Sequence, residues 1–136
     1  MAVRKVYVTK RMSFEACHHL ENYDGKCSRN HGHSYKLEVT FVGGIDTSII
    51  NSNTQATDAM VLDFSEIKKL ISEMVIDQYD HTDLNHYFYQ PTAEVMAVSI
   101  FDTIQKAIGK SDYSVYSVKL WETADSYAEY RGESID

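Results

Sequence analysis

Two stretches in the first third of the chain alternate between apolar and polar residues, as β-strands with one buried face do. In the first stretch, the apolar parity is interrupted only by Lys10 and carries Val6, Val8, Met12, Phe14, Ala16, His18 and Leu20. In the second, the apolar parity carries His31, His33, Tyr35, Leu37, Val39 and Phe41. The alternation therefore predicts two strands, each with histidine at one end of its inward-facing side.

These inward-facing histidines form a candidate metal site. His19 falls on the polar parity of the first strand, so His18 alone of that adjacent pair is predicted to point inward. Two histidines at i and i+2 on one strand reach a single ion, and a third from a paired strand leaves the fourth tetrahedral position of zinc open. A lone His-x-His motif is more often two ordinary histidines. The inward-facing His18 and the nearby thiol of Cys27 favour a metal site.

Helical spacing follows in the middle of the chain. Residues 63–66, with sequence Asp-Phe-Ser-Glu, have the spacing of a capping box. The apolar residues after them recur at helical intervals: Ile67, Leu70, Ile71, Met74, Val75 and Tyr79. A second helix is predicted from Thr92, as N-cap, to Gly109, with a buried face of Ala97, Ile100, Phe101, Ile104 and Ile108.

The remaining stretches complete the fold class. A third alternating stretch places Tyr116, Val118, Leu120 and Glu122 on one parity, and residues 127–130 are expected to form a short final strand. The polar run 43–59 is predicted to be a long loop. The order strand, strand, helix, helix, strand, strand predicts an α+β domain with an antiparallel sheet covered on one face by two helices.

Composition limits the possible partners. The 136 residues suffice for one domain, 1–136, and 43% hydrophobic with 24% charged residues is ordinary for a soluble globular protein. A net charge of −7 argues against non-specific nucleic-acid binding. We see neither a secretory signal nor a stretch of transmembrane length. Two cysteines are consistent with a reducing compartment, so we expect a cytoplasmic protein with neither nucleic acid nor membrane as partner.

Five short signatures occur along the chain in a fixed order. They are Phe14-Glu15-Ala16-Cys17-His18, Lys26-Cys27-x-x-x-His31-Gly32-His33-Ser34-Tyr35, Asp80-His81-x-x-Leu84-Asn85, Pro91-Thr92-x-Glu94 and Trp121-Glu122-Thr123. Together they closely resemble the 6-pyruvoyltetrahydropterin synthase superfamily, in particular its 6-carboxytetrahydropterin synthase branch in queuosine biosynthesis. The resemblance extends from about Val6 to Arg131.

The resemblance implies a fold, an assembly and a set of site residues. The fold would be the tunnelling fold, in which trimers close their sheets into a barrel and two trimers stack into a homohexamer, with active sites at subunit boundaries. By position, the ligands of Zn²⁺ would be His18, His31 and His33. Cys27 would be the catalytic thiol, Asp80 and His81 would complete a relay from a neighbouring subunit, and Glu122 would anchor the pterin ring.

The implied activity is that of a zinc-dependent lyase. It would convert 7,8-dihydroneopterin triphosphate to 6-carboxytetrahydropterin, with release of acetaldehyde and triphosphate. Cys27 would act as a general base, while His81, oriented by Asp80, would exchange protons on the other side. Lys26, Arg29 and Lys36 are candidates for holding the triphosphate.

Two alternatives remain open at this point. One is the sister reaction, elimination to 6-pyruvoyltetrahydropterin without carbon–carbon cleavage; the three-residue gap between Cys27 and His31 and the Pro91-Thr92 pair favour the carboxy branch. The other is a non-catalytic zinc-binding or pterin-binding module, with Cys27 closing the metal site as a fourth ligand. The chain also departs from its relatives, which often carry arginine at the position of His19, and the 43–59 loop is longer than usual.

Overall fold

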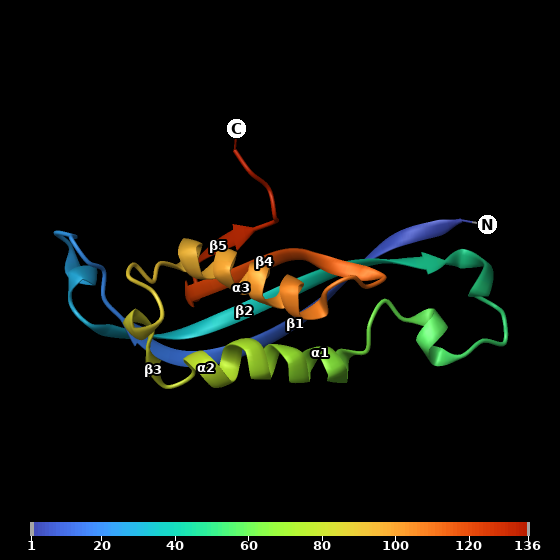
Figure 1. The fold of residues 1–136 in the computed structure, drawn as a ribbon, viewed down its shortest axis with the longest axis horizontal. Helices are drawn as coiled ribbons and strands as arrows, with labels where there is room; N and C mark the ends of the chain where they lie inside the picture. Colours follow the sequence, from blue (N-terminus) through green and yellow to red (C-terminus); the bar gives the residue numbers. More distant parts are fainter. Residues whose placement is uncertain (1, 136) are drawn as a thin grey trace.

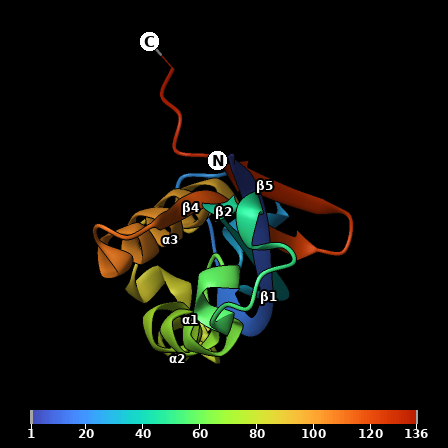
Figure 2. The same ribbon diagram turned by 90° about the vertical axis from the view of Figure 1, so that its right-hand side faces the viewer.

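A single five-stranded sheet forms the framework of the protein in the computed structural model, which describes residues 2–135. The strand order is β3-β1-β2-β4-β5, with bounds β1 (Val3–His18), β2 (His31–Asp46), β3 (Thr82–Asp83), β4 (Tyr113–Thr123) and β5 (Ser126–Tyr130). The helices α1 (Phe64–Ile71), α2 (Asp77–Tyr79) and α3 (Ala93–Ile108) cover one face of this sheet, as Figures 1 and 2 show. The predicted α+β architecture is thus confirmed.

The sheet is mixed rather than purely antiparallel. The two-residue strand β3 pairs in parallel with Ala16 and Cys17 of β1, whereas the other neighbouring strands pair antiparallel. A strand of two residues is too short to show alternation, so the sequence carried no signal for it.

The predicted parity of β1 and β2 is confirmed. Burial increases along β1, from Val6 at 37% exposed to His18 at 2% exposed. In β2, the side chains of Tyr35, Leu37, Val39 and Phe41 are fully buried. β2 also continues to Asp46, so the first residues of the expected 43–59 loop belong to a strand, and the rest includes the 3₁₀ turns Thr47–Ile49 and Ala56–Ala59.

The first predicted helix is divided by a π-helical turn. It begins as predicted at the N-cap Asp63, whose side chain accepts a hydrogen bond from the Ser65 amide (2.8 Å). α1 then continues through the π-turn Ser72–Ile76 into α2. Its buried residues Ile67, Ile71, Val75 and Tyr79 are spaced by four. In an α-helix each such step drifts by about 40°, so the wider π-turn keeps the apolar stripe facing the sheet.

α3 follows its prediction closely. The Thr92 hydroxyl accepts a hydrogen bond from the Val95 amide (3.1 Å), and Gly109, with φ of 58°, ends the helix. Five of its buried residues lie on the side that faces the sheet, namely Met96, Ala97, Ile100, Phe101 and Ile104. No helix among the described residues combines the length and apolarity that a membrane crossing requires.

One prediction in β4 was wrong. Tyr116 was placed on the buried parity with Val118 and Leu120, but it is 36% exposed and stacks edge-on with Tyr7 on the open face of the sheet. In the pairing of β4 with β2, Thr40 lies opposite Ser117 and the next residue, Phe41, lies opposite Val115. Tyr116 is therefore the extra residue of a β-bulge, which reverses the parity of the strand.

Candidate functional site

His18, His31 and His33 lie together where β1 ends and β2 begins. One side-chain nitrogen of each lies within 4.8 Å of the others. The three ring centroids are separated by 4.6, 5.0 and 4.8 Å, so the rings form a nearly equilateral triangle. The structure thus brings together all three residues predicted to bind a metal.

The register of the hairpin produces this cluster. His18 lies directly opposite His31 in the β1–β2 ladder, and His33 lies opposite Ala16. Residues opposite or diagonal to each other on one face of an antiparallel pair are within reach of long side chains. Parity alone placed the three imidazoles on one face, and the pairing register places them at one point.

Hydrogen bonds to backbone carbonyl groups set the tautomers of two of these rings. Nδ1 of His18 lies 2.7 Å from the carbonyl oxygen of Pro91, and Nδ1 of His31 lies 2.7 Å from that of Arg29. A carbonyl oxygen only accepts, so each Nδ1 carries the hydrogen and each neutral Nε2 presents a lone pair. Metal-binding histidines are usually fixed in this way.

The Nε2 atoms of His18 and His31 face each other. They are 3.1 Å apart, and two unprotonated nitrogens at this distance are both acceptors, so a proton or a cation between them is needed to make the contact favourable. Tetrahedral zinc with Zn–N bonds of about 2.0–2.1 Å places its nitrogen ligands about 3.3 Å apart. The spacing in the structure fits two ligands of one zinc ion.

His33 supplies the third nitrogen. Its Nε2 is buried without a hydrogen-bond partner among the described residues and lies 3.6 Å from Oε2 of Glu122. Burial lowers the pKa of His33, and the neighbouring imidazoles of His18 and His31 lower it further, against the opposing effect of Glu122. A neutral imidazole with an unsatisfied nitrogen is a suitable metal ligand, so the three residues fit a zinc ion.

Glu122 lies between the histidine cluster and an adjacent pocket. This pocket of about 540 Å³ is lined by Glu122, by the start of α3 and by the β4–β5 turn. Its other lining residues are Ala93, Glu94, Thr123, Ser126, Tyr127, Ala128 and Glu129. A half-buried carboxylate beside an open pocket can accept hydrogen bonds from N–H donors of a ligand.

Asp80 and His81 form a pair at the β1–β3 edge. Oδ2 of Asp80 lies 3.0 Å from Nδ1 of His81, and Oδ1 of Asp80 accepts a hydrogen bond from the Glu15 amide (2.9 Å). That amide bond, and then the contact with His81, hold the pKa of Asp80 below its usual range. His81 has a φ of 60° and a side chain that is 78% exposed, so its Nε2 side is available to an external partner.

The structure does not bring Cys27 into contact with this pair. Cys27 is half-buried in the 3₁₀ turn Lys26–Ser28, where its carbonyl oxygen accepts a hydrogen bond from the Leu20 amide. Among the described residues, the pocket lined by His81 is lined by Cys17 instead, together with Glu15 and His33. Lys26, Arg29 and Lys36, the candidates for holding a triphosphate, are all exposed.

Comparisons with known proteins agree with this geometry. The family described as "6-pyruvoyl tetrahydropterin synthase" matches residues 7–133. The chain belongs to the 6-pyruvoyl tetrahydropterin synthase family. It is therefore a pterin-converting enzyme with a three-histidine cluster that can hold a metal ion.

Relatives within the 6-pyruvoyl tetrahydropterin synthase family include both branches considered above. The chain is 32% identical to the 6-carboxy-5,6,7,8-tetrahydropterin synthase of Haemophilus influenzae, over 91% of this chain and 97% of that protein. It is 36% identical to the 6-pyruvoyl tetrahydrobiopterin synthase of Poecilia reticulata, over 97% and 94%. The solved Caenorhabditis elegans 6-pyruvoyl tetrahydropterin synthase superposes with a TM-score of 0.78 at 26% identity, covering 96% and 97% of the two chains.

In this member of the family, sequence reasoning missed the groups around the histidines. Pro91 and Arg29 act through backbone carbonyls, which no side-chain pattern can reveal. The side chains of Asn85 and Gln90 also hydrogen-bond to the main chain just after His18. In the sequence, Asn85 is only the last residue of the Asp80-His81-x-x-Leu84-Asn85 signature, and Gln90 carries no signal beyond its place before Pro91.

Proposed function

We propose that the protein is a zinc-dependent 6-carboxy-5,6,7,8-tetrahydropterin synthase. It would convert 7,8-dihydroneopterin triphosphate and water to 6-carboxytetrahydropterin, acetaldehyde and triphosphate, as a step of queuosine biosynthesis. The observation that carries the proposal is the three-histidine cluster, with Cys27 separated from His31 by three residues on the connection between the histidine-bearing strands. The relationship to the Haemophilus influenzae enzyme supports the same branch.

The histidines would hold the metal through one nitrogen each. The neutral tautomers of His18 and His31 are fixed by the carbonyl oxygens of Pro91 and Arg29, so these two rings need no rearrangement before binding. When bound, zinc supplies Lewis-acid polarisation to oxygen atoms of the substrate side chain.

Glu122 would orient the pterin ring. Its carboxylate accepts the amino and ring N–H groups of a pterin, and its proximity to His33 fixes the ring next to the histidine cluster. The pocket beside Glu122 provides space for a bicyclic ring. Orientation of this kind holds the side-chain carbons in place for proton transfer.

Two groups would move protons along the substrate side chain. Cys27 would act as the general base that removes a proton from a side-chain carbon. His81 would donate or accept a proton at Nε2, while Asp80 holds the hydrogen on Nδ1. Because His81 is exposed and the described residues that line its pocket do not include Cys27, we propose that the two meet across a subunit boundary.

The test is the identity of the pterin product. We expect purified zinc-loaded protein, incubated with 7,8-dihydroneopterin triphosphate, to give 6-carboxytetrahydropterin and acetaldehyde by mass spectrometry. The Cys27→Ala variant should bind zinc normally and lose turnover by at least about 100-fold. A product that retains the full three-carbon side chain would instead assign the protein to the pyruvoyl branch, which the 36% identity to the Poecilia reticulata enzyme favours.

A zinc-loaded protein that turns over no neopterin phosphate would contradict both enzyme assignments. That result would favour a non-catalytic binding module. The His31→Ala variant is the matched control for the role of the metal. It removes one predicted zinc ligand and leaves Cys27 and Glu122 in place.

A further inference from the structure

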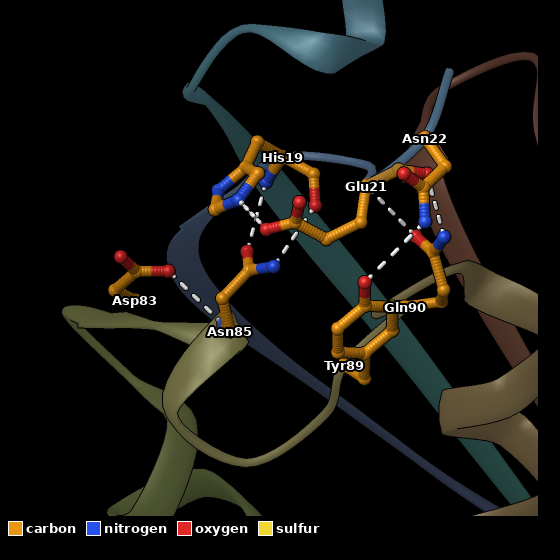
Figure 3. A network of polar contacts seen from close by, with 7 residues as sticks. All are labelled: His19, Glu21, Asn22, Asp83, Asn85, Tyr89 and Gln90. Carbon is orange, nitrogen blue, oxygen red and sulfur yellow. Dashed lines mark hydrogen bonds and ion pairs between the residues drawn. The ribbon is translucent and has the colours of Figure 1, made fainter.

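A short connecting segment, residues 82–91, contacts the end of β1 that carries His18. β3, at the start of this segment, pairs with Ala16 and Cys17, the two residues before His18. The side chains of Asn85 and Gln90 contact the main chain just after it, as Figure 3 shows. The main chain is therefore held on both sides of His18.

Asn85 makes two hydrogen bonds to a single residue. Its Oδ1 accepts from the His19 amide (2.9 Å), and its Nδ2 donates to the His19 carbonyl (3.0 Å). The Asn85 backbone amide in turn donates to Oδ1 of Asp83 (3.0 Å). The Asn85 side chain thus continues the hydrogen bonding between β3 and β1 to His19, the residue just after the end of β1.

Gln90 repeats this arrangement two residues further along. Its Oε1 accepts from the Glu21 amide (2.9 Å), and its Nε2 donates to the Glu21 carbonyl (2.6 Å). We call the paired bonds of Asn85 and Gln90 the amide clamps. Only a carboxamide combines an acceptor and a donor in the positions that each clamp uses.

The segment also reaches the ring of His18. The carbonyl oxygen of Pro91, the residue after Gln90, lies 2.7 Å from Nδ1 of His18. The Thr92 amide donates to the Gln90 carbonyl (2.8 Å), closing a turn around the buried Pro91. The same few residues therefore fix the strand end and the tautomer of a predicted metal ligand.

We propose that Asn85 and Gln90 are positioning residues of the metal centre. The amide clamps hold His18 and the Pro91 carbonyl in mutual register, so that Nε2 of His18 is directed at the other two imidazoles before the metal arrives. The inference rests on the proposed function only in taking the histidine cluster as a zinc site. It does not depend on which pterin product is formed.

The test measures zinc affinity rather than turnover. Metal-free wild-type protein and its variants would be titrated with Zn²⁺ in competition with a chromophoric chelator, and unfolding of the metal-free forms would be followed in parallel. The Asn85→Asp and Gln90→Glu variants each lose one donor and place a carboxylate next to a carbonyl. Gln90→Met loses both bonds without adding charge.

We expect each variant to bind zinc at least about 10-fold more weakly, the range found when groups supporting metal ligands are removed. An added carboxylate would by itself attract the cation and strengthen binding. Weaker zinc binding by Asn85→Asp could therefore not be explained by the added charge. The Co²⁺-loaded variants should also show a changed visible absorption spectrum, since the spectrum reports ligand geometry. If Asn85→Asp does not fold, the two Gln90 variants still test whether the amide clamps affect zinc binding.

Two variants serve as matched controls. Tyr89→Phe removes only the hydroxyl that accepts from Asn22 in the same network (3.4 Å), and Asn53→Asp makes the same exchange at an exposed position of the 47–59 connection. Both should bind zinc like wild type. The proposal is overturned if the clamp variants bind within about twofold of wild type, even when they unfold more easily, or if the controls weaken binding equally. Failure of wild type itself to bind zinc would instead refute the metal site of the proposed function, and the inference with it.

Discussion

At the scale of single residues, two backbone carbonyl groups orient two of the three clustered imidazoles, those of His18 and His31. Parity identified His18, His31 and His33 because alternation assigns each residue to a face of its strand. The backbone carbonyls that fix the tautomers belong to Pro91 and Arg29, and their roles depend on the path of the chain rather than on side-chain type. The clustering of the three histidines was therefore predictable, whereas the groups that orient their rings were not.

Glu122 offers a direct test of substrate orientation. Replacing it in Glu122→Gln removes the negative charge that would accept hydrogen bonds from the pterin. A hydrogen bond to a charged group contributes about 1.5–3 kcal/mol, so we expect KM to rise about 10- to 100-fold. Steady-state kinetics measure this change, and zinc content should be unaltered. An unchanged KM would exclude Glu122 as the pterin anchor.

The lowered pKa of His33 predicts how the stability of the metal-free protein changes in acid. Burial lowers the pKa of His33 below 6.5, so the unfolded chain binds more protons than the folded one as pH falls through that value. The contribution of neutral His33 to the free energy of unfolding is therefore complete above pH 6.5. It decreases as the pH falls from 6.5 to the lowered pKa of the folded state. Urea unfolding in chelator at pH 7.5 and 5.5 measures this loss.

The matched variant for this acid response is His33→Gln. Its stability should fall less between the same two pH values because the titrating ring is gone. Equal losses in the two proteins would show that other groups cause the acid sensitivity.

At the scale of elements, long regular patterns were predicted correctly and local irregularities were not. α3 has a clear cap, a continuous apolar face and a terminal glycine, and all three appear in the structure. The π-turn Ser72–Ile76, strand β3 and the bulge at Tyr116 were missed. Each of these features involves five residues or fewer and depends on packing against the rest of the sheet. None of them therefore produces a periodic pattern in the sequence.

The cap of α3 offers a test at this scale, because the N-cap residue Thr92 directly follows Pro91. The Thr92→Ala variant loses the hydrogen bond to the Val95 amide, and we expect its free energy of unfolding to fall by about 1 kcal/mol. Denaturant unfolding at fixed protein concentration measures the effect. Thr92→Ser keeps the hydroxyl and should lie close to wild type; equal destabilisation by Ala and Ser would show that the cap is not the cause.

At the scale of the whole molecule, the sheet has one covered face and one open face. The helices cover the first face. The open face carries the cross-strand ion pair Arg11–Glu38, and a second ion pair joins Glu129 of β5 to Arg131 just after that strand. Within residues 2–135, strand β5 pairs only with β4, which leaves one edge of the sheet without a partner strand. Unpaired edges favour association, which a site shared between subunits, as proposed above, requires.

Association gives a test of how the catalytic residues meet. The Cys27→Ala and His81→Ala variants would each be inactive alone. If Cys27 and His81 of one site come from different subunits, random reassembly of an equal mixture restores both in about one quarter of the sites. Turnover of the mixture against each variant measures this recovery. A mixture with no more activity than its components would place both residues of each site in one chain.

The central claim is that three imidazoles hold zinc and leave its fourth position open. X-ray absorption at the zinc edge of the loaded protein tests this most directly. We predict only nitrogen and oxygen neighbours at about 2.0–2.1 Å, in wild type and in Cys27→Ala alike. A sulfur neighbour at about 2.3 Å that disappears in Cys27→Ala would show a closed site and contradict the account.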